Sequence, residues 1–287
     1  MRTDVFDGTL RLTNDGKLEL FFLGTGSAFV KKNYQNNLLV IKGDTSLLID
    51  CGTRCPEAFV KYNSSVANVK TLLITHSHAD HIGGVEEIAL THRYMLRNRA
   101  DIVITDIYKK KLWNESLKGG LAYGERHETP YNKHTEDKFL TFDDYFNQIT
   151  PTLLSINPRP IFQVQLGTLD VKMFATMHQP EQAESWKDSA WSTGVLLDDR
   201  VLFTGDTRFD PDLLNWITGT FEIETIFHDC QPFPGGVHAN LAQLETLSPD
   251  IKKKMYICHY GDNFTNDKID GMGFAGLAQP GIYYCYD

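Results

Sequence analysis

One short segment constrains this chain more than any other part of it. The run from Thr75 to Gly84 reads Thr-His-Ser-His-Ala-Asp-His-Ile-Gly-Gly and follows a short apolar stretch. Side chains alternate along a strand, so His76 and His78 are expected on the same side, with Asp80 and His81 turning toward a second position. Four such polar groups cannot share a protein core without a partner that satisfies them. The segment therefore predicts a metal-binding turn between a strand and a helix.

The rest of the chain predicts an α/β architecture with two sheets and outer helices, because short apolar runs alternate with amphipathic stretches. The predicted strands are Leu18–Phe22, Asn37–Ile41, Ser46–Ile49, Thr71–Thr75, Asp101–Thr105, Ile161–Gln165, Asp170–Ala175, Gly194–Leu197, Val201–Thr204, Thr225–Phe227 and Lys254–Ile257. The predicted helices are Val85–Arg97, Ile107–Leu117, Pro211–Ile217 and Asn240–Leu247. No linker divides the chain, so residues 1–287 are expected to form one domain.

Four further potential ligands stand just past the ends of predicted strands: Asp50, His178, Asp206 and His259. Sites in α/β proteins commonly lie at the carboxyl ends of strands, so these side chains are expected to meet. A lone histidine past a strand is more often structural. The number and order of the motifs, however, resemble the metallo-β-lactamase superfamily over nearly the whole chain.

That resemblance implies a four-layer αββα sandwich with two metal sites. It assigns His76, His78 and His178 to the first ion, Asp80, His81 and His259 to the second, and Asp206 to both. Asp80 is also expected to serve catalysis, and Asp50 to orient a histidine. The donors suit two Zn²⁺ ions, with Mn²⁺ or iron as alternatives. A water between two such ions is acidified to hydroxide near neutral pH and can attack a phosphodiester.

Two later segments resemble the ribonuclease Z-like branch of this superfamily. Phe227-His228-Asp229 is followed by a second histidine, His238, and in that branch the acidic residue orients the histidine that protonates the leaving oxygen. The resemblance thus makes Asp229 and His238 catalytic; a surface histidine in a Pro/Gly loop is the alternative. Prokaryotic enzymes of this branch carry a long arm that grips transfer RNA, but only 28 positions separate His178 from Asp206, too few for an arm.

The chain is more similar to the anti-Pycsar phosphodiesterases of phages and bacteria, which have the same core without the arm. Gly24-Thr25-Gly26-Ser27-Ala28-Phe29 and Gln35-Asn36-Asn37 carry this likeness. It implies hydrolysis of 3′,5′-cyclic mononucleotides, evasion of cyclic-nucleotide defence signalling, and a homodimer. A ribonuclease Z-like 3′-processing endonuclease is the second interpretation. A non-catalytic binding module is the third, and the complete set of ligand positions argues against it.

Charge and composition bear on partners and location. The net charge is -9, and the basic runs at Lys109–Lys111 and Lys252–Lys254 resemble solvated surface, so stable nucleic-acid binding is not expected. Five scattered cysteines, no apolar leader and no spanning segment predict a reduced cytoplasmic protein away from membranes, in the host cytoplasm if phage-encoded. The polar stretch Gly119–Thr141 is expected to be a surface loop in which Tyr123, His127, Tyr131 and His134 could contact a base.

Overall fold

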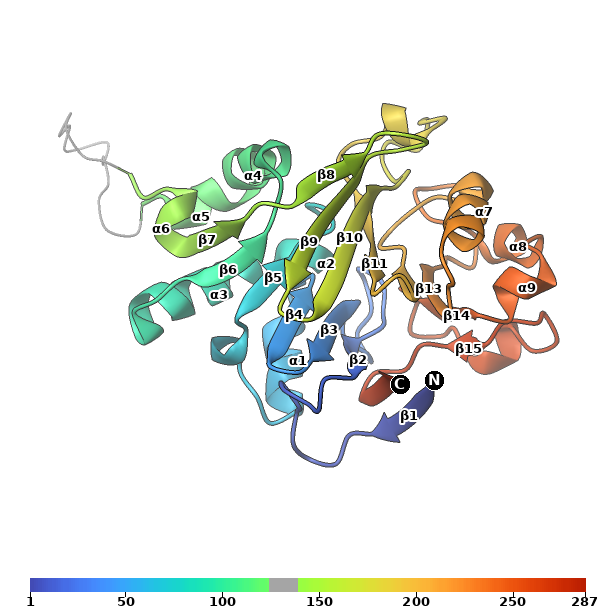
Figure 1. Cartoon of the computed structure of the whole chain (residues 1–287), viewed down its shortest axis with the longest axis horizontal. Coiled ribbons are helices and arrows are strands. Elements are labelled where there is room, and N and C mark those ends of the chain that lie inside the picture. Colours follow the sequence, from blue (N-terminus) through green and yellow to red (C-terminus); the bar gives the residue numbers. More distant parts are fainter. Residues whose placement is uncertain (124–138) are drawn as a thin grey trace.

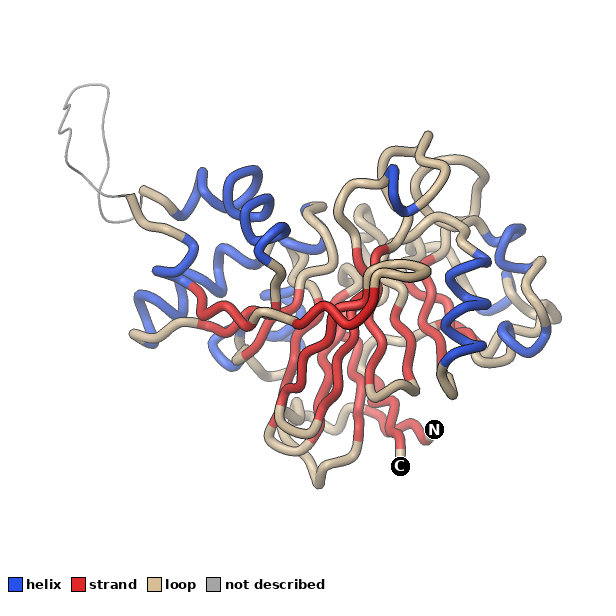
Figure 2. The backbone as a smooth tube through the Cα atoms, turned by 45° about the horizontal axis from the view of Figure 1, so that its top comes forward, coloured by secondary structure: helices blue, strands red, loops and turns tan. Residues whose placement is uncertain are grey.

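Two eight-stranded sheets pack face to face at the centre of the molecule, and helices flank them on both outer sides (Figures 1 and 2). The structure is a computed structural model that describes residues 1–123 and 139–287. The two chain termini lie close together at the same end of the sheets (Figure 1).

The first sheet is built mainly from the N-terminal half of the chain. Its strand order is β1-β16-β2-β3-β4-β5-β6-β7, parallel from β4 to β7 and antiparallel elsewhere. The strands are β1 (Arg2–Val5), β2 (Leu18–Gly24), β3 (Asn37–Lys42), β4 (Thr45–Ile49), β5 (Thr71–Leu73), β6 (Ala100–Val103), β7 (Phe146–Ile149) and β16 (Ile282–Tyr286).

The second sheet is built from the C-terminal half. Its order, β15-β14-β13-β12-β11-β10-β9-β8, is antiparallel from β8 to β12 and parallel from β12 to β15. The strands are β8 (Thr152–Ser155), β9 (Ile161–Leu166), β10 (Leu169–Ala175), β11 (Thr193–Leu197), β12 (Val201–Phe203), β13 (Thr225–Asp229), β14 (Met255–Cys258) and β15 (Gly276–Leu277).

Short helices connect the strands, and several begin with side-chain caps. Thr105, Asp210 and Asn240 each accept a hydrogen bond from a backbone N–H of the first turn that follows. The α-helices are α1 (Cys55–Lys61), α2 (Ala79–Ile82), α3 (Val85–Leu90), α4 (Asp106–Leu112), α5 (Lys118–Leu121), α6 (Phe142–Tyr145), α7 (Pro211–Thr220), α8 (Leu241–Glu245) and α9 (Pro249–Lys252). π-helical turns extend α3 to Leu96 and α4 to Leu117.

Three apolar clusters define the layers, and strand β2 shows how. Leu20 and Phe22 point into the cluster between the two sheets, whereas Phe21 and Leu23 point into the cluster beneath α1 and α3. A third cluster joins the outer face of the second sheet to α7 and α8. Strands buried on both faces read as continuous apolar runs, as β2 does. The order helix, sheet, sheet, helix confirms the predicted αββα sandwich.

The predicted strands are all present, but five strands were missed. Four of them, β1, β7, β8 and β15, are the edges of the two sheets; the fifth, β16, lies between β1 and β2. Edge strands are short and partly exposed, so their sequences lack an apolar run. The predicted loop Gly119–Thr141 is wrong at its start, because Gly119–Leu121 belongs to α5. His127, Tyr131 and His134 lie outside the described residues, whereas Tyr123 is described and packs edge-on against Phe139.

Candidate metal centre

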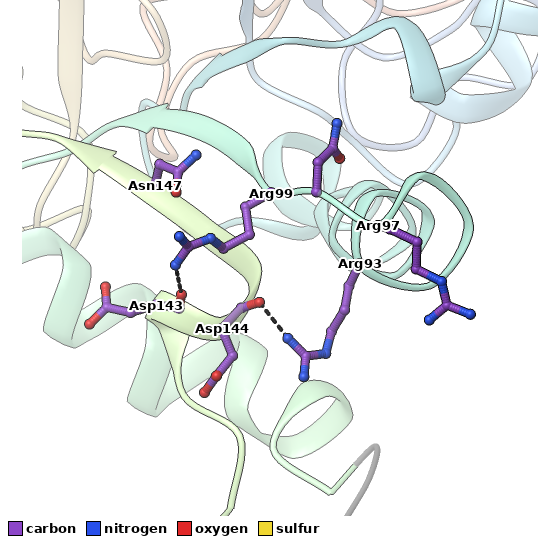
Figure 3. Close-up of a pocket in the computed structure, with 7 residues that line it drawn as sticks. Arg93, Arg97, Arg99, Asp143, Asp144 and Asn147 are labelled. Atoms are coloured by element: carbon purple, nitrogen blue, oxygen red, sulfur yellow. Dashed lines mark hydrogen bonds between the residues drawn. The ribbon is translucent and has the colours of Figure 1, made fainter.

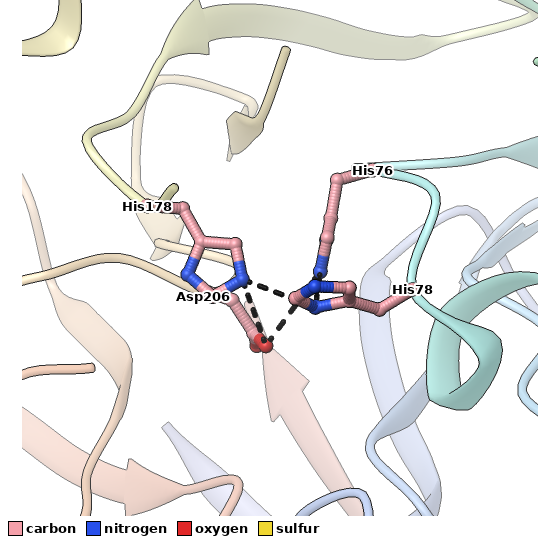
Figure 4. Close-up of side chains that lie close together, drawn as sticks. All are labelled: His76, His78, His178 and Asp206. Atoms are coloured by element: carbon pink, nitrogen blue, oxygen red, sulfur yellow. Dashed lines mark hydrogen bonds and ion pairs between the residues drawn. The ribbon is translucent and has the colours of Figure 1, made fainter. Parts of the chain in front are cut away.

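The first cluster of donors gathers at the ends of β5, β10 and β12 (Figure 4). His76, His78, His178 and Asp206 each place a ligand atom within 4.8 Å of the others. The His78 Nδ1 atom lies 2.9 Å from His76 Nε2 and 3.2 Å from His178 Nε2. Three of the four residues are buried, and His78 is partly exposed. The turn after β5 and the second sheet thus present three imidazoles and a carboxylate to one point.

The second cluster shares Asp206 with the first. Asp80, His81 and His259 lie with Asp206 inside the same 4.8 Å limit, and all four are buried. His81 Nε2 is 3.2 Å from Asp206 Oδ2, and His259 Nε2 is 3.2 Å from Asp80 Oδ2. The structure therefore brings together all seven residues that the resemblance assigned to metal, in the same two groups.

The chemistry of these donors fits a pair of divalent cations. Neighbouring imidazole nitrogens face each other, an arrangement that a shared cation would satisfy better than a hydrogen bond between rings. The Asp206 Oδ1 atom is buried without any hydrogen-bond partner in the described part of the chain. A buried orphan oxygen is costly unless something binds it. Imidazole and carboxylate donors suit zinc, and also manganese or iron.

Asp50 lies behind the second cluster and fixes the orientation of His81. Its Oδ2 accepts a hydrogen bond from His81 Nδ1 at 2.7 Å, leaving Nε2 directed at Asp206. Thr75 donates to the same carboxylate from its backbone N–H and its hydroxyl, both at 2.8 Å. Burial nevertheless raises the pKa of Asp50. This is the orienting role expected of Asp50, and such partners commonly tune metal ligands.

The backbone is unusual where two of these side chains leave their strands. Asp50 and His259 adopt φ angles of 64° and 54°, a region uncommon for residues other than glycine. Such conformations persist where the surrounding structure imposes them, often at functional sites. Gly52 is needed for a different reason: a Cβ atom there would lie 2.1 Å from the Asp80 carbonyl oxygen. The ligand turn therefore packs directly on the backbone that follows β4.

Asp229 and His238 form a pair beside the metal ligands. Asp229 ends β13, is fully buried and accepts a hydrogen bond from His238 Nδ1 at 2.8 Å. His238 Nδ1 also lies 3.8 Å from Asp206 Oδ2. Burial alone would lower the pKa of His238, but the hydrogen bond to Asp229 and the charge of Asp206 raise it to about 9. The predicted pair is thus in contact and adjoins the clustered donors.

The pKa values of the other clustered side chains indicate which of them are neutral and which are charged. Burial lowers the pKa of His178 to about 4 and lowers the pKa of His76 well below its ordinary value. The pKa of Asp206 stays far below its usual range, because the charges of His259 and His81 outweigh its burial. Neutral His76 and His178 beside an ionised Asp206 are protonation states that can bind a cation. His81 differs: burial would lower its pKa, but the charges of Asp206, Asp50 and Asp80 raise that pKa well above its ordinary value.

Sequence reasoning missed several residues that surround this centre. Gln179 contacts the His78 Nε2 atom through its side-chain amide. The Tyr108 hydroxyl lies 3.0 Å from the hydroxyl of Ser77, and its ring stacks on Trp191 with centroids 5.3 Å apart. Only the position of Gln179 directly after His178 could have signalled its role, since the other contacts join segments far apart in the chain.

A separate cavity of about 590 Å³ contains none of these donors (Figure 3). Its lining residues are Arg93, Arg97, Asn98, Arg99, Asp143, Asp144 and Asn147. Arg99 donates to the Asp143 carbonyl oxygen at 2.6 Å, and Arg93 donates to the Asp144 carbonyl oxygen at 2.7 Å. These arginines tie α6 to the end of the helical segment before β6. The cavity is therefore explained by packing between helices.

Comparison with solved structures defines the class of protein. The metallo-beta-lactamase fold protein YhfI from Bacillus subtilis superposes with a TM-score of 0.66, covering 94% of this chain and 100% of that one, at 14% identity. Human tRNase Z, short form, gives a TM-score of 0.59 over 93% of this chain and 98% of that one, also at 14% identity. The chain has the metallo-β-lactamase fold.

Sequence comparison then identifies the family. Residues 18–284 match the model of the family described as Anti-Pycsar protein Apyc1, and the chain belongs to that family. The Anti-Pycsar protein Apyc1 of Bacillus phage BSP38 is 34% identical over 90% of this chain and 95% of its own length. The protein of that name from Paenibacillus harenae is 34% identical over 92% and 98%. Together with the clustered donors, this membership supports a metal-dependent hydrolase.

Proposed function

We propose that this protein is a dinuclear metal-dependent phosphodiesterase that hydrolyses 3′,5′-cyclic mononucleotides. The observation that carries the proposal is the shared carboxylate: Asp206 belongs to both donor clusters described above. Asp206 and His259 also form a third group of neighbouring donors with the hydrogen-bonded pair Asp229–His238. Two cations held around one shared carboxylate would suit hydrolysis of a phosphodiester, because they would neutralise the negative charge that builds up on the phosphate as water attacks.

The residues divide the reaction between them. His76, His78 and His178 would hold one cation, Asp80, His81 and His259 would hold the other, and Asp206 would contribute to both positions. Bound there, the cations supply Lewis-acid activation of the phosphodiester and of the attacking water. Asp80 would serve catalysis as one of the residues that hold the second cation.

Asp229 and His238 serve the leaving group. Asp229 accepts the Nδ1–H of His238, so the Nε2 atom is the one available to donate a proton. As the bond between phosphorus and the leaving ribose oxygen breaks, that proton passes to the oxygen and yields a linear monophosphate. General acid catalysis of this kind needs a histidine held in one orientation, which the buried Asp229 provides.

Three observations support a small cyclic substrate over a long RNA. Relatives that share about a third of their residues with this chain are named anti-Pycsar proteins. Only η4 (Trp186–Asp188), β11 and β12 lie between His178 and Asp206, so no arm projects there. The net charge of -9 also opposes binding of a polyanion. In this proposal the enzyme removes a cyclic-nucleotide defence signal in the cytoplasm, which is the host cytoplasm if the protein is phage-encoded.

A homodimer is part of the same proposal. Strand β8 is an edge of the second sheet, and Leu153 and Leu154 on it are 49% and 51% exposed, with Ile156 beyond it 63% exposed. Exposed apolar edge strands tend to pair with another chain.

In the described part of the chain, no helix is long and apolar enough to cross a membrane.

The test is a kinetic comparison of three substrate classes with the purified, metal-loaded protein: cyclic mononucleotides, cyclic dinucleotides and precursor transfer RNA. Cyclic mononucleotides should give a kcat/KM of about 10⁴ M⁻¹s⁻¹ or more, the low end of ordinary enzymes. The His78→Ala variant, prepared in parallel, controls for contaminating phosphodiesterase. Efficient cleavage of precursor transfer RNA with intact cyclic mononucleotides would establish the ribonuclease Z-like function instead.

A further inference from the structure

A pocket of about 170 Å³ opens beside His238. Its lining residues are Glu181, Arg208, Phe209, Gly235, Gly236, His238 and Gln243. A water molecule occupies about 30 Å³ in the liquid, so the pocket has room for roughly half a dozen waters or one small ring. Of the residues in the proposed reaction, only His238 lines this pocket.

The walls of the pocket are continuous with the metal centre. Arg208 follows Asp206 by two positions, and Glu181 follows His178 by three. His178 Nδ1 also donates to the Val237 carbonyl oxygen at 2.8 Å, which ties a candidate ligand to the loop that carries His238. The pocket and the clustered donors are therefore held in one fixed relation.

The loop in front of His238 is itself held in place. Glu181 Oε1 accepts a hydrogen bond from the Gly236 N–H at 2.7 Å, and Gln231 donates to the Phe233 carbonyl oxygen at 2.9 Å. Gly235 and Gly236 have φ angles of 82° and 78°, which side chains other than glycine rarely tolerate. These hydrogen bonds and backbone angles hold the loop against the pocket as one of its walls.

The polar groups of the pocket can still bind a ligand. Among the described residues, the second carboxylate oxygen of Glu181 has no hydrogen-bond partner. Gln243 uses its Oε1 to accept from the Asn240 N–H, which leaves its side-chain amide hydrogens available. Arg208 donates to the Ala183 carbonyl oxygen and brings a positive charge to the wall of the same pocket. The pocket thus has one positive side chain, Arg208, one negative side chain, Glu181, and free hydrogen-bond donors and acceptors. These groups suit a neutral ring that carries hydroxyl groups. They do not suit a phosphate, which the carboxylate of Glu181 would repel.

We infer that this pocket binds the ribose of the substrate and that Glu181 accepts a hydrogen bond from its 2′-hydroxyl. The inference rests on the proposed function. A group that protonates the leaving oxygen must stand on the leaving side of the phosphate, and in a 3′,5′-cyclic mononucleotide the ring that carries this oxygen is the ribose. A carboxylate is a recurrent partner of ribose hydroxyls in nucleotide sites. Glu181 is thus a specificity-determining residue for ribonucleotides.

The experiment compares kcat/KM for 3′,5′-cyclic AMP and its 2′-deoxy analogue. A hydrogen bond to a charged acceptor should make the wild-type protein prefer the ribonucleotide by about 10-fold or more. Glu181→Ala should bring that ratio close to one, mainly through KM for cyclic AMP. Glu181→Gln, which can still accept from Gly236, should give an intermediate ratio. Gln182→Ala changes an exposed neighbour and should keep the wild-type ratio.

The ratio separates substrate recognition from damage to the loop. If Glu181 only holds the loop, both substrates lose rate equally and the preference remains, which overturns the inference. A wild-type protein that hydrolyses both substrates equally well overturns it too, while the proposed function stands. A wild-type protein that cleaves bis-p-nitrophenyl phosphate but neither cyclic nucleotide refutes the proposed function, and the ribose subsite with it.

Discussion

The two sheets supply the candidate metal centre in different ways. The first sheet contributes four donors through the six residues His76–His81 that follow β5. The second sheet contributes His178, Asp206 and His259 one at a time, just past the ends of β10, β12 and β14. One half of the centre is therefore encoded locally, and the other half depends on how strands far apart in the chain are paired.

This difference explains why Asp206 is central. Strands β12, β13 and β14 are parallel neighbours whose residues Phe203, Phe227 and Tyr256 are in register. Their carboxyl ends consequently coincide and place Asp206, Asp229 and His259 within reach of the turn after β5. Asp206 is the donor that joins the locally encoded half to the assembled half.

The largest expected effect comes from removing the Asp206 carboxylate, which the two donor clusters share. The wild-type protein should bind about two divalent ions per chain, as dinuclear hydrolases do. Asp206→Ala breaks both clusters and should lose most of the metal and all measurable hydrolysis, whereas His78→Ala should retain the ion of the second cluster. Elemental analysis of protein purified without chelator measures this. An Asp206→Ala variant that keeps both ions would refute the shared role.

The next largest effect concerns the assembled half alone. His238→Ala should keep its metal content and lose about 10²–10⁴-fold in kcat, the usual contribution of general acid catalysis. The loss should be smaller on bis-p-nitrophenyl phosphate, because its leaving oxygen needs no proton. Steady-state kinetics on both substrates decide the matter, and equal losses would remove His238 from the acid role.

A smaller effect is expected in the locally encoded half. Asp50→Asn preserves the shape of the side chain but weakens its bond to His81, and loss of such a partner typically costs about 10- to 100-fold in metal affinity or activity. Competition with a chromogenic chelator measures the affinity. Wild-type affinity and activity in this variant would show that the backbone alone orients His81.

The smallest effect is expected in the apolar cluster that packs the two sheets against each other. Phe22 is fully buried between the sheets, with its ring centroid 4.9 Å from that of Phe227. Phe22→Leu should destabilise the protein by on the order of 1 kcal/mol, because the core can partly repack. Metal content should not change. Thermal unfolding measures the stability and elemental analysis measures the metal content. A loss of metal would mean that the candidate centre depends on the packing between the two sheets.

The sequence predicted the interior of the fold better than its margins. Continuous apolar runs such as Leu18–Phe22 specify strands buried on both faces, and these are present. The edge strands β1, β7, β8 and β15 were missed, because a half-exposed strand of two to four residues has no distinctive pattern. Pairing with a neighbour, and not local preference, makes these segments strands.

The sequence by itself indicated the chemistry of the candidate centre: the four polar donors of the His76–His81 turn need a partner that satisfies them, and the other donors follow strands in a recognisable order. Only the tertiary structure decided that His81 is the histidine held by Asp50, and that Glu181 reaches the loop of His238 across 55 positions. The physical reason is distance along the chain. A turn of six residues fixes its own geometry, whereas contacts between distant segments exist only once the sheets have paired and packed.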